Sequence, residues 1–141
     1  MRIIALDLGR RRVGVAVSDP LGITAQGLPT LKPTGRRALI DAIRELVEEY
    51  EAERVVVGLP RNMDGSLGPA ANEALAFAEN LHNVLDLPVD TWDERLTTVA
   101  AHRAMAEGNL SRKKRRDIGD RIAAQLILEG YLESLKRTPT E

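Results

Sequence analysis

The chain has 141 residues, a formal net charge of −1 and no cysteine. Its length fits one domain, residues 1–141, with a core that needs no crosslinks, and the lack of cysteine excludes a disulfide framework and a Cys-based metal site. The N-terminus lacks the apolar segment of a signal peptide and no apolar run approaches the roughly 20 residues of a membrane span, so we expect a soluble cytoplasmic domain.

The N-terminal part of the chain predicts three consecutive strands. Residues 2–7 and 12–18 alternate as strands do, and the tight basic turn between them contains Gly9, which permits a positive φ. A third extended segment, at about 22–31, completes an antiparallel meander. Apolar residues then recur at helical spacing from about 34 to 51, which predicts an amphipathic helix.

Strands and helices alternate in the rest of the chain. VVVGLP at 55–60 is a short apolar run typical of a strand covered on both faces. The remaining expected elements are a loop RNMDGSLGP, a helix that starts near Ala71, a strand at 88–92, a helix opened by DERLTT that ends near Gly108, and a helix at about 117–135. This order predicts an α/β fold with a mixed five-stranded sheet, a three-strand antiparallel meander plus two parallel strands, flanked by helices.

Acidic side chains follow the predicted strands. Asp7 ends the first strand, and Asp93 and Glu94 end the fifth, while Asp117 and Asp120 are spaced to share one face of the last helix. Because parallel strands share their carboxyl edge, we expect the acids that end the strands to converge there. If the last helix docks across this edge, its two carboxylates join them. Alone, an Asp at the end of a strand is more often a turn former than a ligand, and Glu94, Asp117 or Asp120 could simply favour the positive end of a helix. Together they would repel unless a cation held them, and carboxylate oxygens suit Mg²⁺ or Mn²⁺.

Positive charge is concentrated in two clusters, at 10–12 and 112–116, although the net charge is near zero. Either cluster alone could be an ordinary solvated turn. Next to an acidic metal site, however, both could receive a phosphate chain. Five adjacent like charges repel one another, so we expect the 112–116 segment to be a mobile loop in the free protein. Aromatic residues are scarce, which argues against a base-stacking platform.

Four segments together resemble the YqgF (RuvX) family over nearly the whole chain: ALDLGRRRVGVAVSDPLG, VVVGLPRNMDGSLG, DERLTT and DRIAAQLILEGYL, in this order. The resemblance implies a ribonuclease H-like fold and a pre-16S rRNA nuclease that matures the 5′ end of the small-subunit ribosomal RNA. It also implies distant kinship with the Holliday junction resolvase RuvC.

The family's acidic residues fall on Asp7, Glu94 and Asp120, which the resemblance implies to be the catalytic and metal-binding residues; whether Asp117 joins them stays open. The residues expected to contact nucleic acid are Arg11, Arg12, Arg61, Asn62, Arg95, Arg112, Lys113, Lys114 and Arg115. The reading is hydrolysis of RNA phosphodiesters with Mg²⁺ or Mn²⁺, in which two ions stabilise the attacking and leaving oxygens.

Three alternatives remain open at this point. The spacing of Asp117 and Asp120 resembles the paired acids of RuvC-type resolvases, which keeps a DNA junction as a second substrate. A nucleic-acid-binding assembly factor without catalysis is another reading. The strand-turn-strand around Asp7 also resembles the phosphate hairpin of actin-like ATPases, although one lobe and an all-arginine turn argue against that class. A symmetric junction cutter needs two active sites, so whether the chain is a monomer or a homodimer matters.

Overall fold

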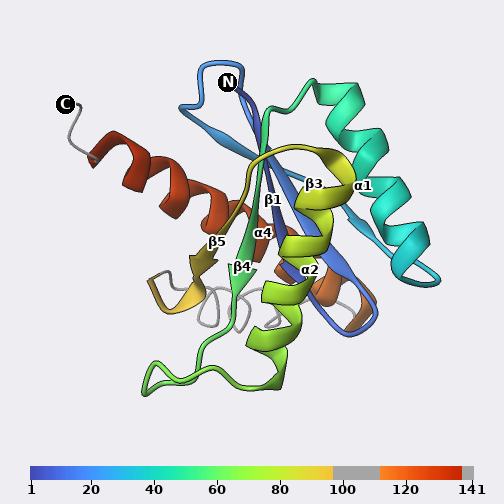
Figure 1. Cartoon of the computed structure of the whole chain (residues 1–141), viewed down its shortest axis with the longest axis vertical. Coiled ribbons are helices and arrows are strands. Elements are labelled where there is room, and N and C mark those ends of the chain that lie inside the picture. The colour runs from blue at the N-terminus through green and yellow to red at the C-terminus, as the bar shows by residue number, and fades with distance from the viewer. Residues whose placement is uncertain (97–111, 138–141) are drawn as a thin grey trace.

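The computed structural model describes the backbone of residues 1–96 and 112–137, and the side chains of residues 1–96 and 119–136. The elements are β1 (Ile3–Leu8), β2 (Val13–Ser18), β3 (Ala25–Leu31), α1 (Arg36–Tyr50), β4 (Arg54–Leu59), α2 (Pro69–Leu85), β5 (Val89–Asp93), the 3₁₀ helix η1 (Glu94–Leu96) and α4 (Arg112–Arg137). Figure 1 shows how they are arranged.

The strands form one five-stranded mixed sheet in the order β3-β2-β1-β4-β5. β1, β2 and β3 are antiparallel neighbours, whereas β4 is parallel to β1 and β5 is parallel to β4. The predicted sheet is therefore confirmed. β1 lies at its centre, so the residues at the end of β1 have neighbours on both sides.

Helices cover both faces of the sheet, α1 and α2 on one and α4 on the other (Figure 1). Side chains alternate along each strand, so Ile4 and Leu6 of β1 enter the core under α1 and α2, while Ile3 and Ala5 enter the core under α4. Asp7 follows the same alternation and belongs to the α4 face.

A polar network attaches α4 to the neighbouring strands β4 and β5. Arg54 Nη1 donates to the Tyr131 hydroxyl at 2.9 Å, and this hydroxyl donates to Asp90. Burial, and then the bond to Asp90, raises the pKa of Tyr131. Because buried polar groups are costly without partners, the network fixes where α4 lies along the sheet.

Two predictions about loops are wrong. The basic segment 112–116 is the start of α4 and not a loop, because Arg and Lys are good helix formers and join the helix that was expected to begin at Asp117. Among the described residues the glycines with positive φ are Gly22 and Gly65, so Gly9 has no such φ. Gly9 is needed because a Cβ there would lie 2.7 Å from the Arg12 carbonyl oxygen.

The remaining predicted elements agree to within a few residues, with one exception outside the described range. The helix expected to open at DERLTT and to end near Gly108 falls mostly on residues 97–111, which are outside the described ones. Of this segment the structure describes Glu94–Leu96, as the 3₁₀ helix η1. No helix in the described part of the chain combines the length and apolar character of a membrane span.

Candidate active site

Asp7 is one of two polar or charged residues that are buried among the described residues, with 5% of its surface exposed. It is paired across β2 with Gly14. On its other side Leu6 is paired with Val57, so Gly58 is the next residue of β4 beside Asp7. The residues beside Asp7 on both neighbouring strands are therefore glycines, so neither strand places a side chain next to the buried carboxylate.

Asp120 occupies the space over Gly14. A Cβ on Gly14 would lie 2.3 Å from the backbone oxygen of Asp120 and 3.4 Å from its Cβ, so α4 contacts β2 directly at this point. The Asp120 carboxylate forms an ion pair with Arg12, whose Nε lies 3.0 Å from Oδ2. Asp120, near the start of the described side chains of α4, therefore lies close to Asp7. Its carboxylate is already paired with Arg12.

Glu94 occupies the space over Gly58. A Cβ on Gly58 would lie 2.6 Å from Glu94 Oε1, so the carboxylate folds back over β4 from the end of β5. Burial, and secondarily the charge of Asp93, raises the pKa of Glu94. Repulsion between neighbouring acids therefore contributes to the raised pKa of Glu94, but burial is its main cause.

The three predicted acids therefore lie along one strip of the α4 face, with Asp7 between the positions that Asp120 and Glu94 cover. Within the described side chains, no three Asp, Glu or His residues are arranged to hold one metal ion. The donor set nevertheless suits a hard divalent cation, because it consists of carboxylates, of which Asp7 is buried and Glu94 is half-buried with a raised pKa. The side chain of Asp117 lies outside the described ones.

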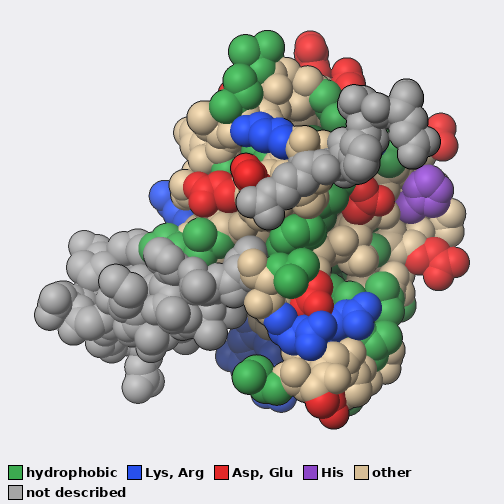
Figure 2. All heavy atoms as spheres, turned by 90° about the vertical axis from the view of Figure 1, so that its left-hand side faces the viewer, with side chains coloured by type: hydrophobic (Ala, Val, Ile, Leu, Met, Phe, Trp, Pro, Cys, Tyr) green, Lys and Arg blue, Asp and Glu red, His purple; other side chains and the backbone are tan. Residues whose placement is uncertain are grey.

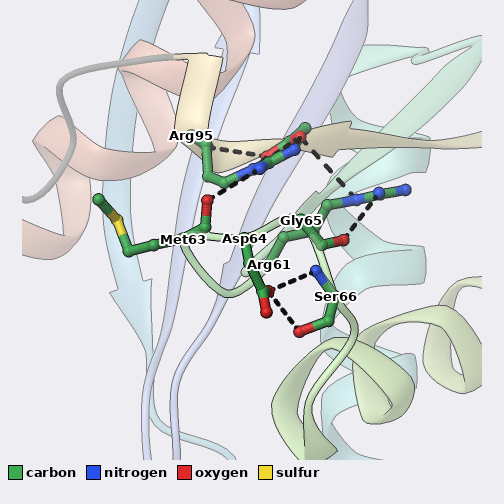
Figure 3. A network of polar contacts seen from close by, with 7 residues as sticks. Arg61, Met63, Asp64, Gly65, Ser66 and Arg95 are labelled. Carbon is green, nitrogen blue, oxygen red and sulfur yellow. Dashed lines mark hydrogen bonds and ion pairs between the residues drawn. The ribbon is translucent and has the colours of Figure 1, made fainter.

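Beside this strip, Arg95 and Asp93 clamp the loop between β4 and α2 (Figure 3). Arg95 donates to the Asp93 carboxylate from Nε at 3.1 Å and from Nη2 at 2.7 Å, and its Nη1 donates to the Met63 carbonyl at 3.5 Å. The hydrogen bond from Arg95 is the main reason that the pKa of Asp93 is lowered. Because Asp93 and Arg95 flank Glu94, this clamp fixes the backbone that carries it.

The loop itself is closed by its own polar groups. Asn62 Nδ2 donates to Ser66 Oγ at 2.9 Å, and Arg61 Nη1 donates to the Gly65 carbonyl at 3.2 Å. Asp64 accepts from the Ser66 backbone N–H at 2.9 Å and from its hydroxyl. Arg61, Asn62 and Arg95, predicted to contact nucleic acid, are thus seen holding the loop, and a contact with nucleic acid stays a prediction.

The other predicted contacts divide into two groups. Arg11 is exposed at the turn between β1 and β2, next to Arg12. Arg112, Lys113, Lys114 and Arg115 lie in the first turns of α4, and their side chains are outside the described ones. Sequence reasoning missed Gly14 and Gly58. Their signal was glycine inside an apolar strand, which marks a close approach by another group.

The fold defines the class of protein first. *T. thermophilus* RuvC in complex with a Holliday junction substrate has a TM-score of 0.62 with 16% identity, covering 99% of this chain and 98% of that one. The fowlpox virus Holliday junction resolvase has a TM-score of 0.54 with 16% identity, covering 95% and 99%. The chain therefore has a RuvC-like ribonuclease H fold.

The sequence then defines the family. The RuvX family model, described as Holliday junction resolvase, matches residues 1–134. A *Clostridium beijerinckii* relative is 51% identical over 137 residues, 97% of this chain and 99% of the relative. A *Moorella thermoacetica* relative is 54% identical over 135 residues, 96% of each. Both carry the name "Putative pre-16S rRNA nuclease". The chain belongs to the RuvX family.

Proposed function

We propose that this chain is a metal-dependent nuclease that hydrolyses phosphodiester bonds in the cytoplasm and matures the 5′ end of precursor 16S rRNA during ribosome biogenesis. The observation that carries the proposal is the buried Asp7, set between two glycines that are covered by Asp120 and Glu94. The names of the curated relatives support the choice of RNA.

In this proposal Asp7, Glu94 and Asp120 hold Mg²⁺ or Mn²⁺. A half-buried carboxylate with a raised pKa is stabilised in its charged form when a cation approaches, so Glu94 gains from binding one. When bound, the ions supply a water of lowered pKa and stabilise charge on the departing oxygen. The clamp of Asp93 and Arg95 keeps the Glu94 backbone in place, which limits the reorganisation that binding requires.

Basic side chains around the strip receive the nucleic-acid backbone. Arg11 and Arg12 lie in the turn that follows Asp7, and the segment from Arg112 to Arg115 precedes Asp120 on the same helix. Phosphate contacts of this kind supply affinity and orientation but carry no sequence information. Arg12 links the two roles, because in the described structure it is paired with Asp120.

The second candidate function is resolution of a Holliday junction. It is favoured by the description of the family and by the likeness in fold to RuvC bound to such a junction. The spacing of Asp117 and Asp120 also suits it. A symmetric junction requires two cuts and hence two active sites.

One experiment distinguishes these functions. Precursor 16S rRNA and a four-way DNA junction are offered in parallel with Mg²⁺ or Mn²⁺, and the cuts are mapped. We expect metal-dependent cuts at the 5′ end of the mature rRNA sequence, lost on chelation and in Asp7→Asn. Paired symmetric cuts in the junction alone would replace the proposal by the second candidate. Binding of either substrate without cleavage under all metal conditions would make the chain a non-catalytic binder.

A further experiment tests the basic start of α4. Replacing Arg112, Lys113 and Lys114 with Ala should weaken RNA binding uniformly across sequences. If all three contact phosphates, the slope of log K against log salt should become shallower by about 2 to 3 units, at about 0.7 to 0.9 per contact. An unchanged slope would remove this segment from the interface.

A further inference from the structure

Basic side chains continue from the turn between β1 and β2 to the neighbouring end of β3. The turn, residues 9–12, carries three arginines and follows directly on Asp7 and Leu8. Val13 of β2 is paired with Leu31 of β3, so Lys32 leaves the sheet at the same end as the turn. Both segments lie at the lower right of Figure 1. Lys32 therefore extends the positive charge of the turn across the edge of the sheet.

Two further arginines lie in the first turn of α1. Arg36 and Arg37 are exposed, and at most about 14 Å of extended chain separates the Cα atom of Lys32 from that of Arg36. This turn of the helix contains no acidic residue, and positive side chains there oppose the helix dipole. Helix stability therefore does not explain why both residues are basic, whereas contact with an anionic partner would.

The two arginines also differ in their pairing from those at the other edge of the sheet. The edge of β5 faces the viewer in Figure 2, and acidic and basic side chains lie next to one another on it. There Arg61 and Arg95 both pair with Asp93. Among the described side chains, neither Arg36 nor Arg37 forms an ion pair with an acid. Their charge is therefore available to a partner from outside the chain.

A groove between α1 and α2 continues this positive surface. It has a volume of about 480 Å³, and the side chains that line it are Arg36, Arg37, Ile40, Asp41, Arg44 and Val84. Its acid, Asp41, is paired with Arg44 at 3.8 Å. The aliphatic side chains can contact a ribose or the face of a base without depriving either of a hydrogen bond. The groove can therefore receive a segment of single-stranded nucleic acid.

The arrangement of the charges suits nucleic acid better than an acidic protein segment. Phosphate groups follow one another along a strand, and the basic residues follow one another in the same way from the turn at 9–12 through Lys32 to Arg37. The series begins next to Asp7, where the proposed function already requires a phosphate chain. An acidic protein segment bound in the groove would need no such continuity with the acidic residues of the site.

We propose that Lys32, Arg36, Arg37 and Arg44, which we call the α1 surface, bind the single-stranded RNA that flanks the cleavage site. The inference rests on the proposed nuclease function, because it assigns a place to a longer part of the same substrate. Phosphate contacts of this kind add affinity and orientation without sequence preference. An RNA long enough to reach the α1 surface therefore binds more tightly than one confined to the cleavage site.

RNA length tests the α1 surface. The short RNA spans the mature 5′ end of the rRNA, and the long RNA adds about 10 unpaired nucleotides on each side. Fluorescence anisotropy at several salt concentrations measures the binding of both to the full chain. In the wild type the long RNA should bind more tightly and with a steeper slope of log K against log salt. Arg37→Gln should lower that slope by about 0.7, the value for one phosphate contact with a single strand, on the long RNA alone.

The matched control is Lys136→Gln, which removes one positive charge from an exposed position near the end of α4. It should leave the slope for the long RNA unchanged. An equal decrease in Arg37→Gln and Lys136→Gln would assign the effect to net charge and overturn the proposal. So would an unchanged slope in Arg37→Gln. If this variant also bound a poly-glutamate probe more weakly than the wild type does, the surface would belong to an acidic protein partner.

Cleavage by the wild type separates this proposal from the nuclease function. The short RNA does not reach the α1 surface, so its cleavage reports on the nuclease function alone. A chain that binds the long RNA through Arg37 but cuts neither RNA would refute the nuclease function and leave the α1 surface as a contact with RNA. A chain that cuts the short RNA and binds the long one no more tightly would refute the α1 surface alone. Failure to bind either RNA would refute both.

A second measurement does not depend on removing a charge. The chain has no cysteine, so a single introduced cysteine can carry a photoreactive label at one position. Thr34 is exposed between Lys32 and Arg36. A label on Thr34→Cys should crosslink to the long RNA and much less to the short one, whereas a label on Lys136→Cys should crosslink to neither. Equal yields from the two positions with the long RNA would contradict the proposal.

Discussion

The face of the sheet under α1 and α2 is lined by large aliphatic side chains, whereas the face under α4 is lined mostly by small ones. Along β2, Val13, Val15 and Val17 point to the first face; the second receives Gly14, Ala16 and Ser18. β1 and β4 follow the same trend. The first face has Ile4, Leu6, Val55, Val57 and Leu59, and the second has Ala5, Asp7, Gly58 and the two larger residues Ile3 and Val56.

The difference shows how one sheet serves two purposes. Large side chains under α1 and α2 bury apolar area and stabilise the fold. Small residues under α4 let the helix and the Glu94 side chain come so close that a single Cβ on Gly14 or Gly58 would collide with them. We therefore expect changes on the α4 face to affect chemistry and changes on the other face to affect stability.

The largest expected effect is on the α4 face. Asp7→Asn should lower the cleavage rate by at least about 10³-fold, because it removes a ligand's charge at nearly constant volume. The double variant Asp7→Asn, Glu94→Gln should be little slower than Asp7→Asn alone, since residues that act as a unit are not additive. Single-turnover cleavage measures both. If the rate losses of the two substitutions multiply in the double variant, or if Asp7→Asn cleaves within tenfold of the wild-type rate, Asp7 does not belong to the site.

On the opposite face, Leu81→Ala removes a fully buried side chain that α2 contributes to the core. The free energy of unfolding should fall by about 2 to 5 kcal/mol, the usual range for truncating a buried leucine. The cleavage rate per folded molecule should stay unchanged below the melting temperature. Urea unfolding and activity assays at low temperature test the two statements, and a large loss of rate in the folded variant would break the comparison.

Gly14→Ala should affect both properties, because the added methyl would meet the backbone of α4 at Asp120. We expect a loss of about 1 to 3 kcal/mol, as for overpacked cores, together with weaker Mn²⁺ binding. The control is Gly35→Ala, where a Cβ would meet nothing within 4 Å. Its free energy of unfolding should change by less than about 1 kcal/mol. If Gly14→Ala left both the free energy of unfolding and Mn²⁺ binding unchanged, the close contact between α4 and β2 would not be needed.

Arg12→Gln should strengthen Mn²⁺ binding in the absence of nucleic acid, because it releases Asp120 from its ion pair. Pairs of partly exposed charges contribute about 0.2 to 1 kcal/mol, so the dissociation constant should fall by about 1.5- to 5-fold. Arg11→Gln removes the same charge from an exposed neighbouring position and serves as the control in calorimetric titrations. A similar gain in both variants would assign the effect to general charge and not to the pair.

The smallest expected effect concerns Asp19, whose carboxylate accepts hydrogen bonds from backbone N–H groups in the connection between β2 and β3. Hydrogen bonds from the backbone N–H groups of Thr24, Ile23 and Leu21 lower the pKa of Asp19 below its usual 3.8. Its contribution to stability is therefore present above that value and lost as the pH falls through the lower, folded-state pKa. The difference in stability between wild type and Asp19→Asn should shrink on acidification below pH 3.8. A difference that does not depend on pH would contradict this.

Much of the fold was predictable from the sequence because it follows from local patterns. Alternating apolar residues gave β1 and β2 their positions, and helical spacing located α1 and α2. Asp120 lies on α4, so the order of the strands does not predict its place, and the family resemblance identified it. The closeness of Asp7 and Glu94 was predictable, because the ends of parallel strands meet. The start of α4 at Arg112 was not predictable in this way, because the mutual repulsion of five adjacent basic residues favours a loop while their helix propensity favours a helix, and in the structure the helix forms.

The packing of the site was not predictable in the same way. The pairing of Arg12 with Asp120 joins residues that are distant in the sequence, and it depends on where α4 crosses β2. Likewise, Arg61 and Arg95 read as phosphate contacts from their charge alone, while the structure shows them bound to Asp93 and to loop carbonyls. Local composition identifies such groups as basic, but only tertiary packing decides which acid or carbonyl they reach.

The position of α4 after all five strands in chain order has a consequence for synthesis. Domains generally fold from their N-terminal part as they emerge from the ribosome, so β1 with Asp7 is available long before α4 with Asp120. Until α4 has been synthesised, the small-residue face of the sheet stays uncovered. A nascent chain that still lacks α4 therefore carries an incomplete set of acids, even when its sheet has already formed.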